Sequence, residues 1–273
     1  MSLNMQLQSP AREPVIAITA ALASGGDIRL INPSLSLVSA VVDRTHTEAA
    51  GGHLSVVLPP ALVGALDDRF PTAAQLADLA SDGRAAVHSV PDAMDGTLVG
   101  GALVGVVYTR GETAALLTLE TGRWGRWVER AWETAVAASA PIDHDQVGYA
   151  TLRATLADQL SSPIAASFDA LVQAARRRRP TDAAIDPTAI ALLATAWHAG
   201  QLAEVTRWGV DAAIASRSTF SRVKSQLADA GVLETTPIPQ DVGRPRLRLE
   251  LRPPHREQPD PDALIDAAGS VIG

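Results

Sequence analysis

Residues 216–231 concentrate hydroxyl and cationic side chains, and no acidic residue precedes Asp229 in this segment. Phe220, Val223 and Leu227 recur at helical spacing, so the segment is predicted to be an amphipathic helix that starts at a hydroxyl cap and ends at Gly231. Its polar side chains can donate hydrogen bonds to phosphate oxygens and to acceptors on the base edges of double-stranded DNA. The candidates for such contacts are Arg217, Ser218, Thr219, Ser221, Arg222, Lys224 and Ser225.

The cations of this set are expected to differ in role. A guanidinium can donate two hydrogen bonds to one guanine, whereas an ammonium acts as a compact point charge. Arg217 and Arg222 are therefore the leading candidates for base contacts, and Lys224 is the candidate for a phosphate contact.

A second basic feature is the tetrapeptide Gly243-Arg244-Pro245-Arg246. The proline favours an extended backbone, narrow enough for both arginines to enter a minor groove, where A·T-rich sequence deepens the negative potential. Its Gly-Arg-Pro part resembles the core of AT-hook peptides. The alternative is an arginine-bearing turn that contacts only phosphates or solvent, and this alternative stays open.

The elements around these residues have the order of a winged helix-turn-helix. Asp186 and Pro187 supply a cap and a first-turn proline for a helix over residues 188–198, and a second helix is predicted over residues 201–208. Beyond the third helix, residues 232–236 and 247–251 alternate apolar and polar side chains, which predicts a hairpin with the basic tetrapeptide in its connection. We therefore predict a DNA-binding domain over residues 186–252.

The charge of the chain limits where DNA can bind. Residues 186–252 contain eight basic and seven acidic side chains, whereas the whole chain has a net charge of -7. The rest of the chain is therefore acidic and repels DNA, so binding should be confined to one basic face. Four arginines at residues 176–179 are interpreted as a solvated helix end, with phosphate contact as the alternative.

Composition indicates where the protein works. Lys224 is the only lysine among 23 basic residues, the chain has no cysteine, and its pI is about 5.3. This pattern is typical of haloarchaeal proteomes and, more generally, of GC-rich genomes. The first 14 residues lack a secretory pattern, and the longest apolar run, residues 98–108, is too short to cross a bilayer. We therefore expect a cytoplasmic protein without membrane contact.

An α/β domain is predicted over residues 14–140, with a mostly parallel sheet and flanking helices. Helices are expected over residues 15–24, 35–45, 61–68, 72–82 and 125–139, and strands over residues 27–31, 54–58 and 85–90. Two further strands should turn at residues 109–112, which would place an antiparallel pair near the end of the domain.

Catalytic residues are not evident in this domain. Glycines between residues 100 and 105 lie in an apolar strand pattern, so strand packing explains them better than a nucleotide-binding loop does. The six histidines show no metal-ligand spacing. We therefore expect no enzyme activity, no cofactor and no metal. The weak candidates for ligand binding are Arg123, Trp124, Arg126 and Trp127, which are equally suited to packing at a domain or dimer interface.

Connecting helices are predicted over residues 141–180. They carry apolar stripes that suit either an internal core or the contacts of a homodimer, which a palindromic operator would require. Residues 253–273 are predicted to be a linker, rich in proline and charge, followed by one or two amphipathic helical turns that dock back.

The chain resembles the haloarchaeal transcriptional regulators of the TbsP type. The resemblance lies in Arg207-Trp208-Gly209, in the Ser-Thr-Phe-Ser-Arg sequence of residues 218–222, and in residues 241–249. The N-terminal order of elements is also similar to the phospholipase D-like sensor domains of TrmB-type regulators, although the His-x-Lys motif of active phospholipases is absent. The resemblance implies a sequence-specific regulator of central carbon metabolism, with a non-catalytic α/β domain that binds a small-molecule effector or a second regulator.

Two alternatives to this interpretation remain. The first is an α/β enzyme of unknown substrate that its winged helix directs to a target. The second is a protein-interaction module without DNA binding, which would be expected to expose apolar side chains where the third helix carries Arg217, Ser221, Arg222 and Ser225.

Overall fold

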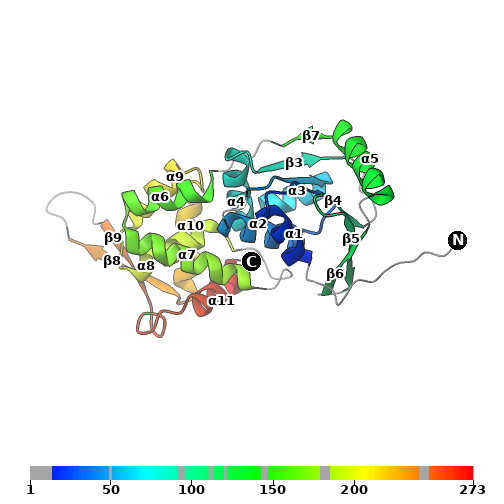
Figure 1. Ribbon diagram of the computed structural model, residues 1–273. Coiled ribbons are helices and arrows are strands. Elements are labelled where there is room, and N and C mark those ends of the chain that lie inside the picture. The colour runs from blue at the N-terminus through cyan, green and yellow to red at the C-terminus, as the bar shows by residue number, and fades with distance from the viewer. Residues whose placement is uncertain are drawn as a thin grey trace. The chain divides into compact units, whose positions relative to one another are not determined.

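The computed structural model describes residues 14–48, 51–91, 96–110, 113–119, 122–142, 147–178, 185–239 and 246–272 (Figure 1). The chain divides into two compact units. The N-terminal unit contains residues 1–68 and 75–145, and the C-terminal unit contains residues 69–74 and 146–273. Among the described residues, no helix is long and apolar enough to cross a membrane.

The N-terminal unit is built on a seven-stranded sheet in the described part of the chain. Its strands are β1 (Ile28–Ile31), β2 (Leu54–Leu58), β3 (Ala85–Ser89), β4 (Thr97–Gly101), β5 (Gly105–Arg110), β6 (Thr113–Thr118) and β7 (Ala140–Pro141). Their order across the sheet is β6-β5-β4-β1-β2-β3-β7, in which β1, β2 and β3 are parallel. Its helices are α1 (Pro14–Ala23), α2 (Leu35–Thr47), α3 (Pro60–Asp67) and α5 (Arg123–Ala137), together with α4 (Phe70–Ser81), whose residues up to Ala74 belong to the C-terminal unit.

This architecture confirms the predicted α/β fold, with a parallel centre and flanking helices. The antiparallel part is larger than the single pair expected from the sequence. β4, β5 and β6 extend one side of the sheet and β7 pairs with β3 on the other, all antiparallel to their neighbours. β5 and β6 pair as far as Arg110 and Thr113, whereas Gly111 and Glu112 of the predicted turn lie outside the described residues.

The two faces of the sheet are covered differently. Ile28 and Leu30 of β1 belong to a buried core that also contains Val38 and Val41 of α2. Along β1 the side chains alternate between faces, and Arg29, on the opposite face, forms an ion pair with Glu129 of α5. The sheet therefore separates α2 from α5, as the ribbon also shows (Figure 1).

The glycines of β4 are explained by packing, as predicted. A Cβ added at Gly100 would lie 2.8 Å from Cγ1 of Val128, and one added at Gly101 would lie 2.1 Å from the carbonyl oxygen of Asp27. Gly101 also has a positive φ of 95°, which residues with side chains rarely adopt. Close packing at the sheet therefore requires glycine at both positions.

The C-terminal unit contains the helices α6 (Tyr149–Gln159), α7 (Ser162–Arg177), α8 (Pro187–Trp197), α9 (Leu202–Asp211), α10 (Arg217–Asp229) and α11 (Pro261–Ile272). The strands β8 (Leu233–Ile238) and β9 (Arg246–Leu251) form an antiparallel hairpin, and a bridge between Gln201 and Arg248 adds the start of α9 to it. Helices α8 to α10 and this hairpin form the predicted winged helix-turn-helix. The structure extends β9 to Arg246, which the sequence had placed in the connection between the strands.

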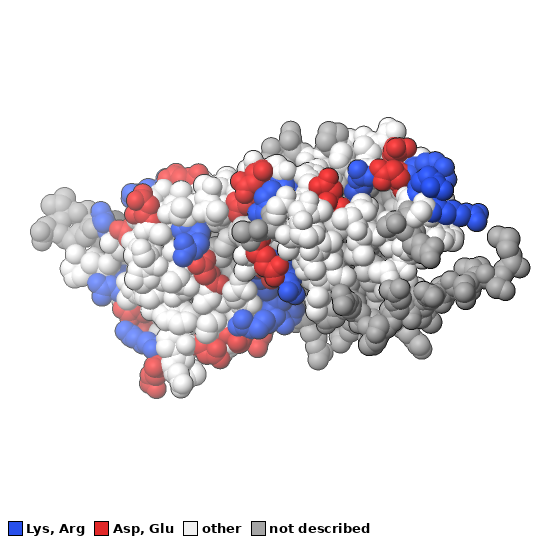
Figure 2. All heavy atoms as spheres, viewed as in Figure 1, with Lys and Arg blue, Asp and Glu red and all other residues white. Residues whose placement is uncertain are grey.

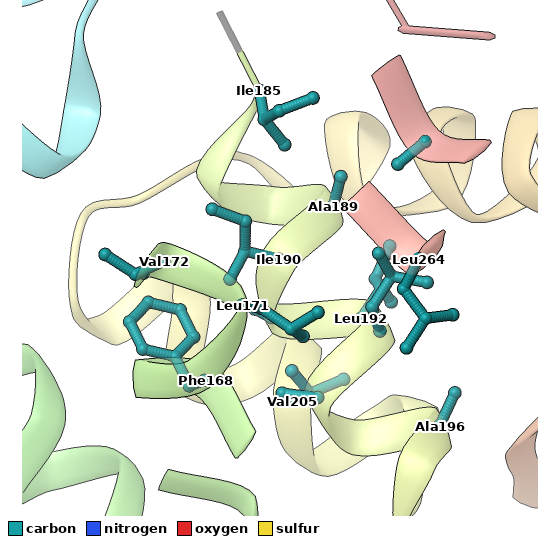
Figure 3. Close-up of a cluster of buried hydrophobic side chains, with 14 of the residues drawn as sticks. Phe168, Leu171, Val172, Ile185, Ala189, Ile190, Leu192, Ala196, Val205 and Leu264 are labelled. Carbon is teal, nitrogen blue, oxygen red and sulfur yellow. The ribbon is translucent and has the colours of Figure 1, made fainter. Parts of the chain in front are cut away.

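A single core joins the helices of this unit (Figure 3). It includes Phe168 of α7, Ile190 of α8, Val205 of α9 and Leu264 of α11. The apolar stripes of α6 and α7 are thus buried within the unit. Helix α11 is longer than the one or two turns expected from the sequence, and its buried Leu264, Ile265 and Ala268 confirm that the tail docks back.

Candidate nucleic-acid interface

Hydroxyl side chains fix the start of α10. Ser216 is the N-cap residue, and its Oγ accepts a hydrogen bond of 3.2 Å from the backbone N–H of Thr219. The same Oγ lies 2.7 Å from Oγ of Ser218 and 3.0 Å from Oγ1 of Thr219. A serine cap stabilises a helix by about 1 kcal/mol. Thr219, a candidate for DNA contact, is half-buried and engaged in this cap.

Apolar contacts hold α10 in a defined orientation. Phe220, Val223 and Leu227 are fully buried on one face of the helix, in the core that includes Trp208 of α9. Gly209 of α9 faces the ring of Phe220, because a Cβ added at Gly209 would lie 2.2 Å from Cζ of that ring. This close approach of the two helices explains the glycine and sets the angle of the helix-turn-helix.

The remaining polar candidates of α10 lie outside this buried face. Arg217, Ser218, Ser221 and Arg222 are exposed, and Lys224 and Ser225 are half-buried. With 3.6 residues per turn, Ser218, Ser221, Arg222 and Ser225 occupy the side opposite the core. Arg217 and Lys224 are seven residues apart and therefore share one flank of the helix.

The exposed cations of α10 keep their charge available. Nη1 of Arg222 donates a 2.9 Å hydrogen bond to Oε1 of Gln226, which is a neutral partner. Ser225 Oγ donates to the carbonyl of Ser221, one turn earlier. Within the described part of the chain, no ion pair involves Arg217, Arg222 or Lys224. The arrangement presents cations and hydroxyl groups on a rigid helix, as contact with a nucleic acid requires.

The hairpin places a second pair of arginines beside α9. Arg246 and Arg248 are exposed and lie two residues apart on β9, so both project from the same side of the strand. Nη1 of Arg246 donates a 3.2 Å hydrogen bond to Oε1 of Gln201. Arg244, with Gly243 and Pro245, lies outside the described residues.

Acidic residues neutralise the other end of the hairpin. Arg252 lies 3.5 Å from a carboxylate oxygen of Glu234, and Arg256 lies 2.7 Å from a carboxylate oxygen of Glu250. Among the described residues of α10 and the hairpin, Arg217, Arg222, Lys224, Arg246 and Arg248 form no ion pair, and the same holds for exposed Arg207 of α9. In the face drawn in Figure 2, basic and acidic side chains are interspersed.

The arginine run at the end of α7 holds the tail helix. Arg177 forms hydrogen bonds of 2.8 to 3.0 Å with the carboxylate of Asp262, and Arg178 lies 3.8 Å from a carboxylate oxygen of Asp266. Burial lowers the pKa of Arg176 to about 10, which still leaves it charged at neutral pH. Arg177 and Arg178 are therefore structural partners of α11, and this accounts for them without a phosphate contact.

The four weak ligand candidates lie at the start of α5, and only one of them lines a cavity. Trp124 and Trp127 are each 43% exposed, and their rings meet edge to face at 6.4 Å. Trp127 lines a cavity, together with Arg130, whereas Arg123, Trp124 and Arg126 do not. Arg130 was not among the residues predicted from the sequence, although its position three residues after Trp127 places both on one side of the helix.

Neither a metal site nor a reactive histidine is found among the described residues. They contain no group of three or more histidine, aspartate or glutamate side chains placed to hold a metal ion. The buried face of His88 packs against Trp132, and burial lowers the pKa of this histidine. His88 is thus part of the packing under α5.

The fold and the exposed face of α10 define the class of protein: an α/β domain followed by a winged helix-turn-helix of the kind found in transcriptional regulators. Two family models match the chain, one described as the N-terminal domain of TbsP-like transcriptional regulators, over residues 11–142, and one as their C-terminal helix-turn-helix domain, over residues 148–269. The chain therefore belongs to the TbsP-like transcriptional regulators. Comparison with curated proteins and with solved structures found no significant match.

Proposed function

We propose that the protein is a sequence-specific regulator that reads the major groove of DNA with α10. The observation that carries this proposal is the exposed side of α10, where Ser218, Ser221 and Arg222 lie opposite a fully buried apolar face and no acidic residue intervenes. Recognition helices of this fold present such side chains to base edges. The exposed large apolar side chains of the described residues all lie outside α10, which favours DNA over a protein partner.

The side chains of α10 divide by position. Arg222 lies on the side opposite the core and is proposed to hydrogen-bond to a base, with Ser218, Ser221 and Ser225 beside it. Arg217 and Lys224 share one flank, where the DNA backbone would run. Lys224 is proposed to contact a phosphate, and Arg217, in the first turn, to reach a base edge or the adjacent phosphate.

The wing is proposed to contact the minor groove next to the major-groove site. Arg246 is exposed at the start of β9 and would act with Arg244. Guanidinium groups are favoured in narrow A·T-rich minor grooves. This contact would add preference for the bases that flank the core of the operator.

The regulated genes are proposed to be those of central carbon metabolism in a haloarchaeon, on the basis of the family resemblance and the composition. The N-terminal unit is proposed to bind an effector or a second regulator without catalysis, in the manner of the sensor domains of TrmB-type regulators. In concentrated salt the Debye length falls to about 3 Å, so affinity would rest on close hydrogen bonds more than on long-range attraction.

We also propose that the protein acts as a homodimer through its N-terminal unit. The apolar stripes of α6 and α7 are buried in the C-terminal unit and leave little for a partner. Most of the exposed large apolar side chains of the described residues lie in the N-terminal unit instead, at Ile16, Tyr108, Trp124 and Trp127, whereas the C-terminal unit exposes Val210. A dimer would place two copies of α10 on the half-sites of a palindromic operator.

The proposed function is tested by recovering bound genomic fragments by chromatin immunoprecipitation and measuring their affinity for purified variants in gel shifts. Arg222→Ala is expected to weaken binding by about tenfold to a hundredfold, as loss of a bidentate base contact would. Arg256→Ala is the matched control, because Arg256 is an exposed arginine of the same unit already paired with Glu250. Equal affinities for wild type and Arg222→Ala would refute the assignment of α10.

A further inference from the structure

A cavity of about 460 Å³ lies in the N-terminal unit, at the ends of its three parallel strands. Its wall contains Ile31 and Asn32 at the end of β1, Pro59 just after β2, and Val90 just after β3. In open α/β sheets, ligands bind outside the carboxyl ends of the strands. The volume lies within the range of about 300–1,000 Å³ typical of small-molecule sites.

Helix α5 forms the opposite wall and is held in place by contacts that do not line the cavity. Val128 packs against Gly100 of β4, and Glu129 forms an ion pair with Arg29 of β1. The guanidinium of Arg29 also lies 5.7 Å from the ring of Trp132. These anchors on one side of α5 leave the side that carries Trp127 and Arg130 facing the cavity.

Small side chains on α5 create the space. Ala131, Ala135 and Ala138 line the cavity at successive turns of the helix, between the larger Trp127 and Arg130 and the strand ends. A longer apolar side chain at any of these alanines would reduce this volume. In a close-packed interface between a helix and a sheet, larger side chains would fill this space, so the three alanines leave it open.

The lining has the chemistry of a site for an amphipathic anion. Most of its side chains are apolar, and they include the indole ring of Trp127. Arg130 is exposed, and no ion pair with it is found among the described residues. A guanidinium matches a carboxylate through two parallel hydrogen bonds. The oxygen-bearing side chains that accompany it are Asn32 and Thr134.

The charge of the ligand is limited by the same geometry. Arg130 is the one basic side chain of the lining in the described residues, and the cavity reaches Ala138, at the C-terminal end of α5. The negative end of the helix dipole lies there and disfavours additional negative charge. A single carboxylate therefore fits better than a doubly charged phosphate.

We propose that this cavity is the effector site of the N-terminal unit, and that it binds a small planar ring compound bearing one carboxylate, with the ring against Trp127 and the carboxylate on Arg130. The inference rests on the proposed role of this unit in sensing. It names a site and a ligand class for that role.

The test uses 2-naphthoate and its neutral analogue 2-naphthamide, titrated calorimetrically into the full-length protein. Wild type is expected to bind naphthoate at one site and naphthamide at least about tenfold more weakly. Arg130→Ala should weaken naphthoate at least about tenfold and leave naphthamide unchanged. Ala135→Leu should weaken binding of both, because its longer side chain would project into the cavity and take space from the ring of the probe.

Arg126→Ala is the matched control, since Arg126 lies on the same helix outside the cavity, and it should bind both probes like wild type. Wild type that binds neither probe, or Arg130→Ala that binds naphthoate as wild type does, would overturn the inference. If circular dichroism shows that Ala135→Leu does not fold, the binding of the two probes to wild type and to Arg130→Ala still tests the inference.

The same samples are assayed for binding to immunoprecipitated genomic fragments in the absence of probe. Retained DNA binding without probe binding would refute the effector site alone. If wild type does not bind DNA in this assay, the proposed function is refuted, whatever the probes show.

Discussion

Arg222 and Lys224 stand two positions apart in α10 but on different sides of its exposed surface. Arg222 lies away from the core, with a neutral amide as its neighbour, whereas half-buried Lys224 lies on the flank that it shares with Arg217. A base contact changes the sequence that is preferred, whereas a phosphate contact changes affinity for all sequences together. We therefore propose different roles for these two cations of one helix.

Lys224→Ala is expected to lower affinity for all DNA sequences to a similar extent. Each phosphate contact contributes about one unit to the slope of log affinity against log salt, so the slope should fall by about one. Gel shifts over a series of salt concentrations measure this slope, with Arg256→Ala as the control that should retain it. An unchanged slope would show that Lys224 does not contact the backbone.

Arg244→Ala is expected to weaken binding and to remove the preference for A·T pairs that flank the core site. The physical reason is the stronger negative potential of narrow minor grooves, which favours an inserted guanidinium. Selection from random DNA measures the flanking preference while the core preference set by α10 persists. Identical flanking preferences for wild type and variant would limit the wing to phosphate contacts or to none.

At the scale of elements, the contact between α9 and α10 determines where the recognition surface points. Gly209→Ala is expected to lower the free energy of unfolding by about 1–3 kcal/mol, because the added methyl would overlap the buried ring of Phe220. Urea denaturation of the full chain measures the change.

Gly64→Ala is the matched control for this substitution. Gly64 lies within α3 and no atom approaches within 4 Å of an added Cβ, so alanine should be neutral or stabilising there, by up to about 1 kcal/mol. Equal effects at the two glycines would mean that Gly209 does not set the packing of the helix-turn-helix.

The elements that could be predicted from the sequence are those with local signals. The cap at Ser216, the periodicity of Phe220, Val223 and Leu227, and Gly231 at the end all lie within one segment, and the structure reproduces this helix closely. The α/β order was likewise predicted from alternating patterns, although four antiparallel strands replaced one expected pair.

The features that were missed depend on residues far apart in the chain. The length of α11 reflects a core shared with α7 and α8, and Arg177 finds its partner Asp262 at a separation of 85 residues. Arg130 becomes notable only because α5 lies against the ends of three strands. No local sequence pattern predicts these long-range contacts, because they depend on the order of the strands and on how the helices pack.

At the scale of the whole molecule, charge limits where DNA can bind, and the proposed dimer would determine how much DNA is contacted. The net charge of -7 repels DNA outside the basic surface of α10 and β9. One recognition helix contacts a short stretch of DNA, and two-fold symmetry doubles this stretch. We therefore propose that each chain has one confined basic surface and that a dimer presents two of them to the DNA.

The dimer is tested by light scattering on the full-length protein. The monomer mass is 28.5 kDa, so a mass of about twice this value is expected, both alone and with operator DNA. Replacing exposed Trp124 by serine should shift the population toward the monomer if the N-terminal unit provides the contact. A monomer mass under both conditions would exclude the dimer.

The central claim, that α10 reads DNA sequence, is tested most directly by selection from a random duplex library with wild type and Arg222→Ala side by side, at the salt concentration at which the protein is stable. Wild type is expected to enrich a defined motif, and Arg222→Ala to enrich the same motif with the preference relaxed at the position that Arg222 contacts, at a cost of about 1–3 kcal/mol. The claim would be contradicted if wild type enriched no motif, or if wild type and Arg222→Ala enriched the same motif with the same preference at every position.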